Sequence, residues 1–167
     1  ISVTDDEVDR YYQNNKAQYL DKPAEVQVRR ILLPVTDPSQ EAQVLQKADT
    51  LRAELIASPQ KFAAYAKEHS SDSKTAANGG LMPFFAKGSH ERAFEKAAFT
   101  LPKENDISAV IKTNEGYQIL QLAAKKAPTY KPVTQVSAQI KELLKAKKFN
   151  DQFTNDMRSV VSSADSK

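Results

Sequence analysis

Two runs of alternating residues on either side of a short turn constrain the fold of this chain more than any other feature. Apolar and polar side chains alternate in residues 107–113 and 117–122, and the residues between them are Asn114, Glu115 and Gly116. Alternation places one side of a strand on a core, and glycine supplies the backbone conformation that a tight hairpin turn requires. The pattern predicts a β-hairpin, so part of the core should rest on an antiparallel sheet.

Further strands and helices are predicted before this hairpin. An alternating segment that ends in an apolar stretch is typical of a strand with one buried end, and a Ser-Pro pair is typical of a helix start. The predicted order is a strand at 24–35, helices at 39–56 and from Ser58 onward, a strand at 81–85, a helix at 89–99 and the hairpin. This order favours an α+β fold with a sheet of about four strands.

Both ends of the chain are predicted to be helical. Thr4 and Glu7 have the spacing of a capping box, and Val3 and Val8 have that of a hydrophobic staple. Near the other end, apolar residues recur at helical spacing after an extended linker. We therefore expect an N-terminal flanking helix in residues 1–22, a central domain in 23–126, and a linker with a C-terminal amphipathic helix in 127–167.

Composition excludes several classes of protein. The chain has no Cys and two His in 167 residues, so we expect no disulfide, no metal site and no cofactor held by such residues. Charged residues make up 27% and mean hydropathy is −0.58, which is typical of a globular domain with charged helix surfaces. No apolar run is long enough to span a bilayer.

Positive charge is concentrated near the end of the chain. Residues 125–167 carry nine basic and four acidic residues, against a net charge of +3 for the whole chain. Such a segment can bind nucleic acid or anionic lipid. Its lysines follow a helical pattern with few aromatic neighbours, which favours an ordinary solvated helix face and no nucleic-acid partner.

The chain begins without Met and without a charged segment that leads into an apolar one. We expect a mature or excised piece of a longer protein. Any membrane contact would then depend on an anchor outside this chain, upstream of Ile1.

Several short motifs occur together in the central region. They are Phe62-Ala63-Ala64-Tyr65-Ala66, Ser71-Asp72-Ser73, Asn78-Gly79-Gly80-Leu81, Phe85-Ala86-Lys87-Gly88, Phe94-Glu95-Lys96-Ala97-Ala98-Phe99 and Gly116-Tyr117-Gln118-Ile119. Together they resemble the parvulin, or PpiC-type, peptidyl-prolyl isomerase domain over residues 24–125. With its helical flanks, the chain is similar to extracytoplasmic foldases of the PpiD, SurA and PrsA kind. The resemblance implies a four-stranded antiparallel sheet surrounded by helices and a shallow site for an X-Pro segment.

The resemblance also implies a proline pocket built from apolar side chains. The family's three pocket positions fall on Met82, His90 and Phe94, and Phe85 lies on the same wall. His90 stands where an apolar residue is common, so the pocket is expected to be more polar than usual. Taken singly, Met82 and Phe94 also fit plain core packing, and His90 fits a surface position in the first turn of a helix.

The polar residues of the site differ from the family pattern. Arg30 stands where the first strand usually carries a His, and Gln118 stands where a second His follows the hairpin glycine. The Cys or Asp between them falls on Ser73, which Asp72 could replace after a shift of one residue, whereas Thr113 is retained. The resemblance therefore implies candidate catalytic positions at Arg30, Asp72, Ser73, Thr113 and Gln118.

Arg30 needs a partner if its side chain faces this site. A guanidinium stays charged at ordinary pH, so its burial requires a carboxylate or a route to water. We expect Arg30 to pair with Asp72 or Glu115. The alternative is a register that differs by one residue, with Arg29 turned inward or both arginines on an edge.

Two functions are compatible with these residues. The first is a peptidyl-prolyl cis-trans isomerase and foldase for X-Pro bonds of unfolded proteins, weak in activity because Arg30, Ser73 and Gln118 replace the usual residues. The second is a non-catalytic module that binds client chains, since an apolar groove and backbone contacts suffice for capture. Both imply extended, proline-containing polypeptides as partners and a periplasmic or cell-envelope location. Lys87 and Arg92 near the pocket mouth favour an acidic residue before the proline.

Overall fold

The structure is a computed structural model that describes residues 1–165, with side chains up to residue 161. The chain forms two compact units. The larger unit is Pro23–Ala127, and the smaller one combines Ile1–Lys22 with Pro128–Lys167. Each unit has a hydrophobic core of its own.

The larger unit is built on an antiparallel sheet of three strands. Strands β2 (Glu25–Leu33), β4 (Gly116–Lys126) and β3 (Ile111–Thr113) lie in the order β2-β4-β3. β2 and β4 pair along their whole length. β3 and β4 form the predicted hairpin, and Gly116 at its turn has a φ of 131°, a conformation that favours glycine.

Two predicted strands are shorter or more interrupted than expected. In place of a fourth strand, the structure has two isolated bridges to β2, one at Leu81 and one at Phe85. Between the bridges the edge segment advances four residues while β2 advances three, so one extra residue interrupts the ladder. The first arm of the hairpin is also broken, because the Oγ of Ser108 accepts the N–H of Leu120 at 2.9 Å in place of a backbone oxygen. The sheet of about four strands is therefore three strands with a bridged edge segment.

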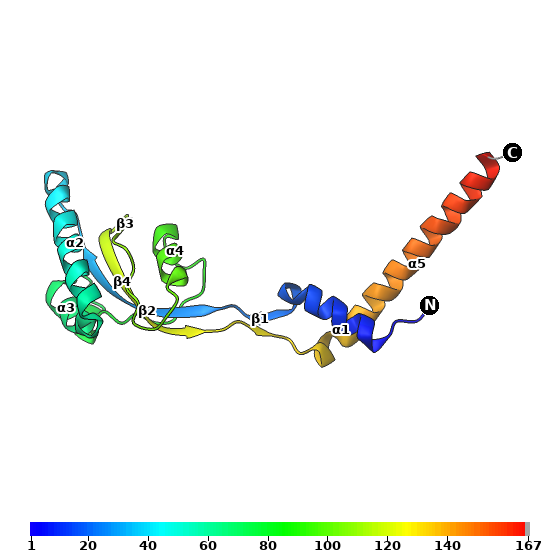
Figure 1. Cartoon of the computed structure of the whole chain (residues 1–167), viewed down its shortest axis with the longest axis horizontal. Coiled ribbons are helices and arrows are strands. Elements are labelled where there is room, and N and C mark those ends of the chain that lie inside the picture. Colours follow the sequence, from blue (N-terminus) through cyan, green and yellow to red (C-terminus); the bar gives the residue numbers. More distant parts are fainter. Residues whose placement is uncertain (166–167) are drawn as a thin grey trace. The chain divides into compact units, whose positions relative to one another are not determined.

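Helices cover both faces of this sheet. α2 (Glu41–Ala57) and α3 (Phe62–His69) lie on one face, and α4 (Arg92–Thr100) lies on the other (Figure 1). A 3-10 turn, Pro59–Lys61, leads into α3, but the side chain of Ser58 before it forms no capping hydrogen bond within the described structure. The remaining 3-10 turns are Lys16–Tyr19, Pro38–Gln40 and Ala76–Asn78.

The alternation of β2 and β4 divides the core of the larger unit into two clusters. On the face covered by α2 and α3, Ile31 and Ile119 pack with Leu55 and Phe62. On the face covered by α4, the buried cluster consists of Val26, Val28, Met82, Phe85, Phe94, Ala98, Leu101, Leu120 and Leu122. Both faces of the sheet are thus apolar over most of their area, so a polar side chain on either face needs a hydrogen-bond partner.

The smaller unit is built on the packing of two helices. α1 (Asp5–Asn14) lies against α5 (Val133–Asp165). The predicted capping box between Thr4 and Glu7 is confirmed, with both of its hydrogen bonds present. The buried side chains of this pair are Val8, Tyr12, Val136 and Ile140. The apolar stripes of the two terminal helices therefore partly cover each other.

A short sheet in the smaller unit joins the expected linker to the end of residues 1–22, where a strand follows α1 and a 3-10 turn in place of a continuous helix. β1 (Leu20–Lys22) pairs antiparallel with β5 (Thr129–Tyr130). The Tyr12 hydroxyl donates to the Lys131 carbonyl oxygen at 2.6 Å, next to this pair. The segment before α5 is thus held by α1 and β1 of the same unit.

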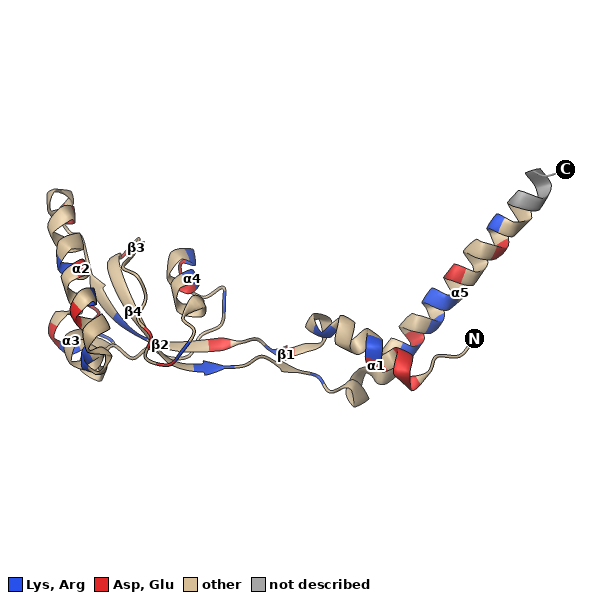
Figure 2. Cartoon of the chain, viewed as in Figure 1, with Lys and Arg blue, Asp and Glu red and all other residues tan. Residues whose placement is uncertain are grey.

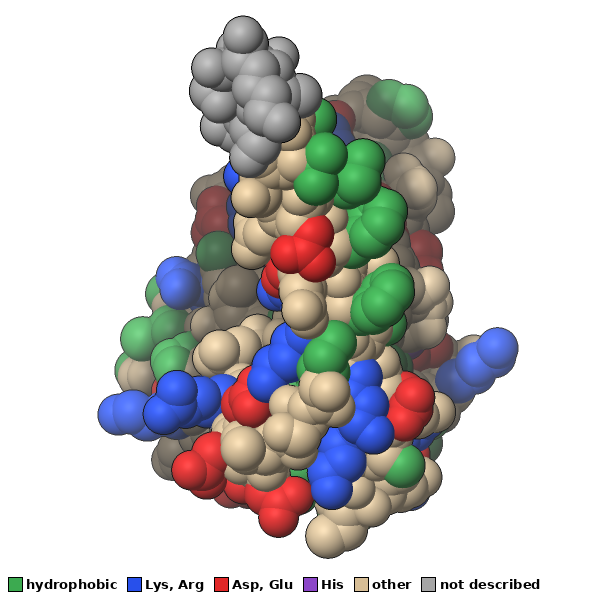
Figure 3. Space-filling model, turned by 90° about the vertical axis from the view of Figure 1, so that its right-hand side faces the viewer, with side chains coloured by type: hydrophobic (Ala, Val, Ile, Leu, Met, Phe, Trp, Pro, Cys, Tyr) green, Lys and Arg blue, Asp and Glu red, His purple; other side chains and the backbone are tan. Residues whose placement is uncertain are grey.

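The second half of α5 carries a row of exposed apolar side chains. Phe149, Phe153, Met157 and Val160 are between 49% and 63% exposed and follow one another along the helix (Figure 3). Acidic residues are interspersed with the lysines of α5 (Figure 2), as on a solvated helix face. None of the described helices combines the length and apolarity that crossing a membrane requires.

Replacing Gly80 by alanine is expected to destabilise the larger unit more than replacing Gly88. Gly80 has a φ of 82°, and a Cβ there would lie 2.5 Å from the Arg30 carbonyl oxygen. Gly88 has a φ of 102° but no described atom within 4 Å of its Cβ position, so only the conformational cost applies. In urea unfolding, Gly80→Ala should lose roughly 1–2 kcal/mol more than Gly88→Ala. Equal losses would contradict this packing.

Candidate functional site

The candidate site lies on the sheet face that α4 covers. Side chains alternate along β2, so Val28 and Arg30 point to this face, whereas Arg29 and Ile31 point to the other. β4 runs antiparallel to β2 in a register that brings Gln118 to the same face as Arg30. The site therefore combines apolar residues near α4 with polar residues nearer the hairpin turn.

The apolar part of the site is a wall of three buried side chains. Met82, Phe85 and Phe94 are 8%, 6% and 2% exposed, and the rings of Phe85 and Phe94 are 5.7 Å apart. The exposed ring of His90 lies against both, 4.3 Å from Phe85 and 5.1 Å from Phe94. All four residues predicted for the proline pocket are adjacent. The alternative reading of Met82 and Phe94 as core residues also holds, because one side of the wall belongs to the core.

The position of His90 differs from the alternative prediction. α4 begins at Arg92, so His90 belongs to the segment before the helix and not to its first turn. This segment turns the His90 ring back onto Phe85 and Phe94. An exposed residue thus contributes one face of its ring to the apolar wall.

The polar part of the site is a chain of hydrogen bonds centred on Arg30. Its Nε lies 2.9 Å from Asp72 Oδ2, and its Nη1 lies 3.4 Å from Glu115 Oε2. Nη1 also donates to Gln118 Oε1 at 3.3 Å, and Gln118 Nε2 donates to Thr113 Oγ1 at 2.9 Å. The Thr113 hydroxyl donates in turn to the carbonyl oxygen of Gly116, at 2.8 Å. The predicted pairing of Arg30 with a carboxylate is therefore confirmed, with both acids as partners.

Asp72, and not Ser73, provides the carboxylate that contacts Arg30 of β2. Asp72 is 8% exposed and accepts hydrogen bonds from Arg30, from the Thr75 hydroxyl and from the Lys74 N–H. Ser73 is exposed and lies outside this network. Burial raises the pKa of Asp72, but the hydrogen bonds from Thr75 and Arg30 outweigh it and leave that pKa below its usual value. Asp72 is thus a carboxylate at neutral pH.

Thr75 was not predicted as part of the site. It is 8% exposed and donates its hydroxyl proton to Asp72, three residues before it. An Asp followed three residues later by Thr is a common local hydrogen-bonding pattern. That pattern was the available signal in the sequence, but it is too frequent to indicate a site by itself.

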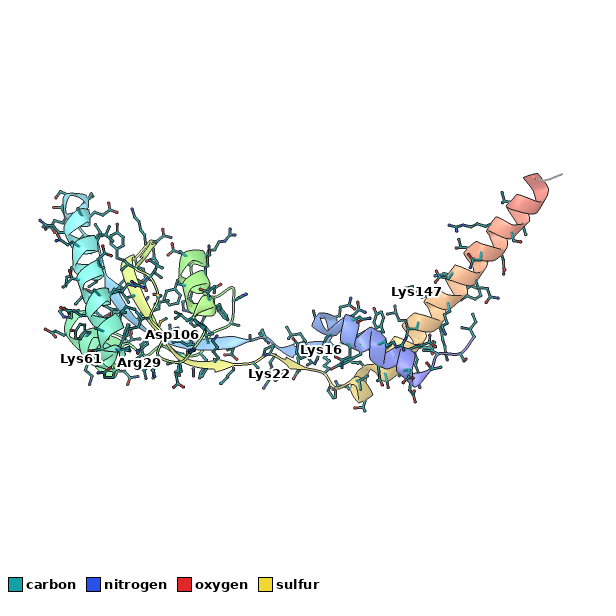
Figure 4. The ribbon with its side chains drawn as sticks, in the orientation of Figure 1. Lys16, Lys22, Arg29, Lys61, Asp106 and Lys147 are labelled. Atoms are coloured by element: carbon teal, nitrogen blue, oxygen red, sulfur yellow. The ribbon has the colours of Figure 1, made fainter. Side chains whose placement is uncertain are left out.

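The alternative register for Arg29 and Arg30 is excluded. Arg29 lies on the opposite face, where its Nη1 donates to Gln121 Oε1 at 3.3 Å. It lines a cavity of about 430 Å³ together with Pro59, Gln60 and other residues near the start of α3 (Figure 4). Arg29 therefore takes no part in the network of Arg30.

The network holds polar atoms in place, and its charged members are Arg30, Asp72 and the exposed Glu115. Arg30 stays charged, Gln118 and Thr113 do not ionise in this range, and Asp72 already accepts three hydrogen bonds. Among the described residues no group of three His, Asp or Glu side chains is arranged to hold a metal ion. The chemistry that this arrangement supports is binding and orientation next to a dry apolar wall.

An antiparallel sheet with helices on both faces, and with an apolar wall and a polar network on one of them, defines an α+β domain. A family model for the PPIC-type PPIASE (rotamase) domain matches residues 30–124. This match covers more than half of the chain, which therefore belongs to the PpiC-type peptidyl-prolyl isomerase family.

Individual relatives support this membership. Foldase protein PrsA of Clostridium botulinum is 30% identical over 156 residues, which cover 92% of this chain and 43% of that protein. Foldase protein PrsA 1 of Listeria monocytogenes is 34% identical over 110 residues, which cover 66% of this chain and 34% of that protein. A solved structure from work on two SurA-like chaperones of Campylobacter jejuni matches 98% of this chain and 63% of its own, with a TM-score of 0.58 and 27% identity. The chain spans less than half the length of either PrsA relative.

Removing Arg30 alone is expected to destabilise the larger unit by about 3 kcal/mol, because Asp72 then keeps a buried charge without its cation. Asp72→Asn should cost less, since Arg30 retains Glu115. In urea unfolding, the double variant Arg30→Met/Asp72→Asn should lose less stability than the sum of the two single variants. Strict additivity would show that the pair is not coupled.

The same variants have an expected pH dependence. Because folding lowers the pKa of Asp72, the stability contributed by its carboxylate is present at neutral pH and is lost as the pH falls below about 4. Asp72→Asn should therefore flatten the acid limb of the stability profile.

Proposed function

We propose that this chain is a peptidyl-prolyl cis-trans isomerase and foldase that acts on X-Pro bonds of unfolded polypeptides. The observation that carries the proposal is the adjacency of Met82, Phe85, His90 and Phe94 on the sheet face that also holds Arg30. Membership of the PpiC-type family supports the reaction class. The two PrsA relatives are foldase proteins, which supports the role of a foldase.

The reaction requires rotation about the amide that precedes proline. Its barrier of about 20 kcal/mol arises from amide resonance, which a twisted amide loses. A twisted amide is less polar than a planar one, so a site with little water favours the transition state over the ground state. The wall of Met82, Phe85 and Phe94 would exclude water from the proline ring, and His90 would cover its outer side. This reaction needs no nucleophile and no proton transfer.

We propose that the activity is weak. In this network Arg30 and Gln118 stand where the family usually has histidines, and their hydrogen bonds to Asp72, Glu115 and Thr113 already engage them. Less of their hydrogen-bonding capacity is then left for a twisting amide. The same observation favours a second candidate function, a non-catalytic module that binds extended client chains on the apolar wall.

The clients and the location are also proposals. An apolar wall of three buried side chains suits extended, proline-containing segments of unfolded polypeptides. The solved structure that matches 98% of this chain comes from work on SurA-like chaperones, which include a periplasmic protein. This supports an extracytoplasmic location, in the periplasm or cell envelope.

The wall should decide catalysis on X-Pro peptides. Met82→Ala and His90→Ala are each expected to lower kcat/KM about tenfold, the effect of losing part of a well-packed apolar contact with the proline. Phe149→Ala removes an exposed aromatic ring of the smaller unit, which is not part of the wall, and serves as the control. Activity that persists in both pocket variants would contradict this site. Binding of an unfolded client without isomerase activity in the wild type would favour the second function.

A basic cavity supports a preference for an acidic residue before the proline. Lys87, Arg92 and Lys96 line a cavity of about 370 Å³ beside Phe99, whose ring is 5.7 Å from that of Phe85. None of these three cations forms an ion pair within the described part of the chain. Glu95 lines the same cavity, so three cations face one carboxylate and the lining stays net positive next to the wall.

This preference can be measured with paired peptides. At low salt, kcat/KM for a Glu-Pro peptide should be about two to five times that for the matching Leu-Pro peptide, as expected for partly exposed charges. The ratio should fall in Lys87→Gln/Arg92→Gln, whereas Lys61→Gln, on the other side of the sheet, should leave it unchanged. Equal rates on the two peptides in the wild type would end the idea.

A further inference from the structure

The segment between Phe85 and α4 carries His90, and its backbone is held by one carboxylate. Glu95 lies in the first turn of α4 and points back to this segment. Its two oxygens accept the N–H groups of Gly88, Ser89 and His90, each at 2.9 Å. Three consecutive backbone amides thus donate to one side chain. These hydrogen bonds fix the path of the backbone in the loop before α4. We call residues 86–91 the wall loop.

The side chains of the wall loop fix the His90 ring in turn. The Ser89 hydroxyl donates its single proton to the Ala86 carbonyl oxygen at 2.9 Å. The same hydroxyl oxygen lies 2.9 Å from His90 Nδ1, and with its proton on the Ala86 carbonyl oxygen it accepts from a ring protonated at Nδ1. The ring is thereby turned onto Phe94, with 23° between the two ring planes.

Besides Glu95, the described contacts between the centre of this loop and α4 are the His90 ring on Phe94 and the Lys87 ammonium 5.4 Å from the centre of the Phe99 ring. Gly88 has no described atom within 4 Å of its Cβ position and adopts a φ of 102°. Lys87, Ser89 and His90 are exposed. A loop with so few packing contacts depends on its hydrogen bonds for a single conformation.

The charge on Glu95 suits this task. Hydrogen bonds from the amides of Gly88 and His90 hold the pKa of Glu95 below its usual value, so it remains a carboxylate. Lys87, Arg92 and Lys96 line the same cavity and add to the positive potential around it. The amides thus receive a full negative charge, which makes their hydrogen bonds stronger than those to a neutral acceptor.

We propose that Glu95 is a positioning residue of the proline pocket, which sets the place of His90 against Phe85 and Phe94 by holding the backbone of the wall loop. The inference rests on the proposed function of that pocket. Glu95 itself touches neither Phe85 nor the proline site. On a Leu-Pro client, which places no charge in the cavity that Glu95 also lines, it acts only through His90.

The position of His90 can be measured by NMR without any ligand. In the wild type, the carbon-bound ring protons of His90 should be shifted by the ring currents of Phe85 and Phe94, and the neutral ring should be protonated at Nδ1. In Glu95→Gln both signatures should decrease, because an amide cannot accept three N–H groups as a carboxylate can. Methyl shifts of Ile31 and Leu55, in the other core cluster, should not change, which separates a displaced loop from an unfolded domain.

A double-mutant cycle then tests the link to client binding. Affinity for a short Leu-Pro peptide, which puts no charge in the cavity beside Glu95, should fall about fivefold in Glu95→Gln, the loss expected from one weakened contact. The same substitution in a His90→Ala background should have no further effect, since Glu95 acts through His90. Glu104→Gln, which changes an exposed acid outside the loop, is the matched control.

The outcomes separate this inference from the proposed function. Unchanged His90 signals in Glu95→Gln, or equal losses of affinity with and without His90, would overturn the positioning role. A wild type that binds no X-Pro peptide would overturn the proposed function, while the NMR comparison would still decide whether Glu95 holds His90 in place.

Discussion

The antiparallel pairing of β2 with β4 is the constraint on which the rest of the larger unit depends. Its register puts Arg30 and Gln118 on one face of the sheet and Ile31 and Ile119 on the other. A shift of one residue would exchange the faces, because side chains alternate with a period of two. The guanidinium of Arg30 would then lie in the apolar cluster under α2 and α3. The two cores therefore enforce the register that assembles the polar network.

Local signals made part of this fold predictable. The hairpin and β2 could be predicted from alternating residues and from a turn glycine. Each of these patterns is contained in a stretch of about a dozen residues. The carboxylate partners of Arg30 followed from the cost of burying a charge. The pairing of β1 with β5 could not be predicted. The two strands are more than a hundred positions apart in the sequence, and each is too short to show alternation. The bridges at Leu81 and Phe85 depend on the edge of β2, which no local pattern describes.

The candidate site was predictable as a set of residues but not in its detail. The motifs indicated Met82, Phe85, His90 and Phe94, and the structure brings these side chains together. The choice between Asp72 and its neighbour depends on which carboxylate reaches Arg30, a distance that spacing does not give. Glu95 was hidden for a different reason. Its partners are backbone N–H groups, which every residue has and no sequence pattern marks.

The apolar wall and the polar network are joined through the hairpin turn. Glu91 at the end of the wall loop accepts the N–H of Asn114 at 2.9 Å, and the next residue, Glu115, contacts Arg30 at 3.4 Å. The loop that carries His90 is thus tied to the turn whose side chain reaches Arg30. Hydrogen bonds that share anchoring residues stabilise one another, because each is formed in an already ordered place. The order of the wall loop and that of the polar network therefore depend on each other through the turn at residues 114 and 115.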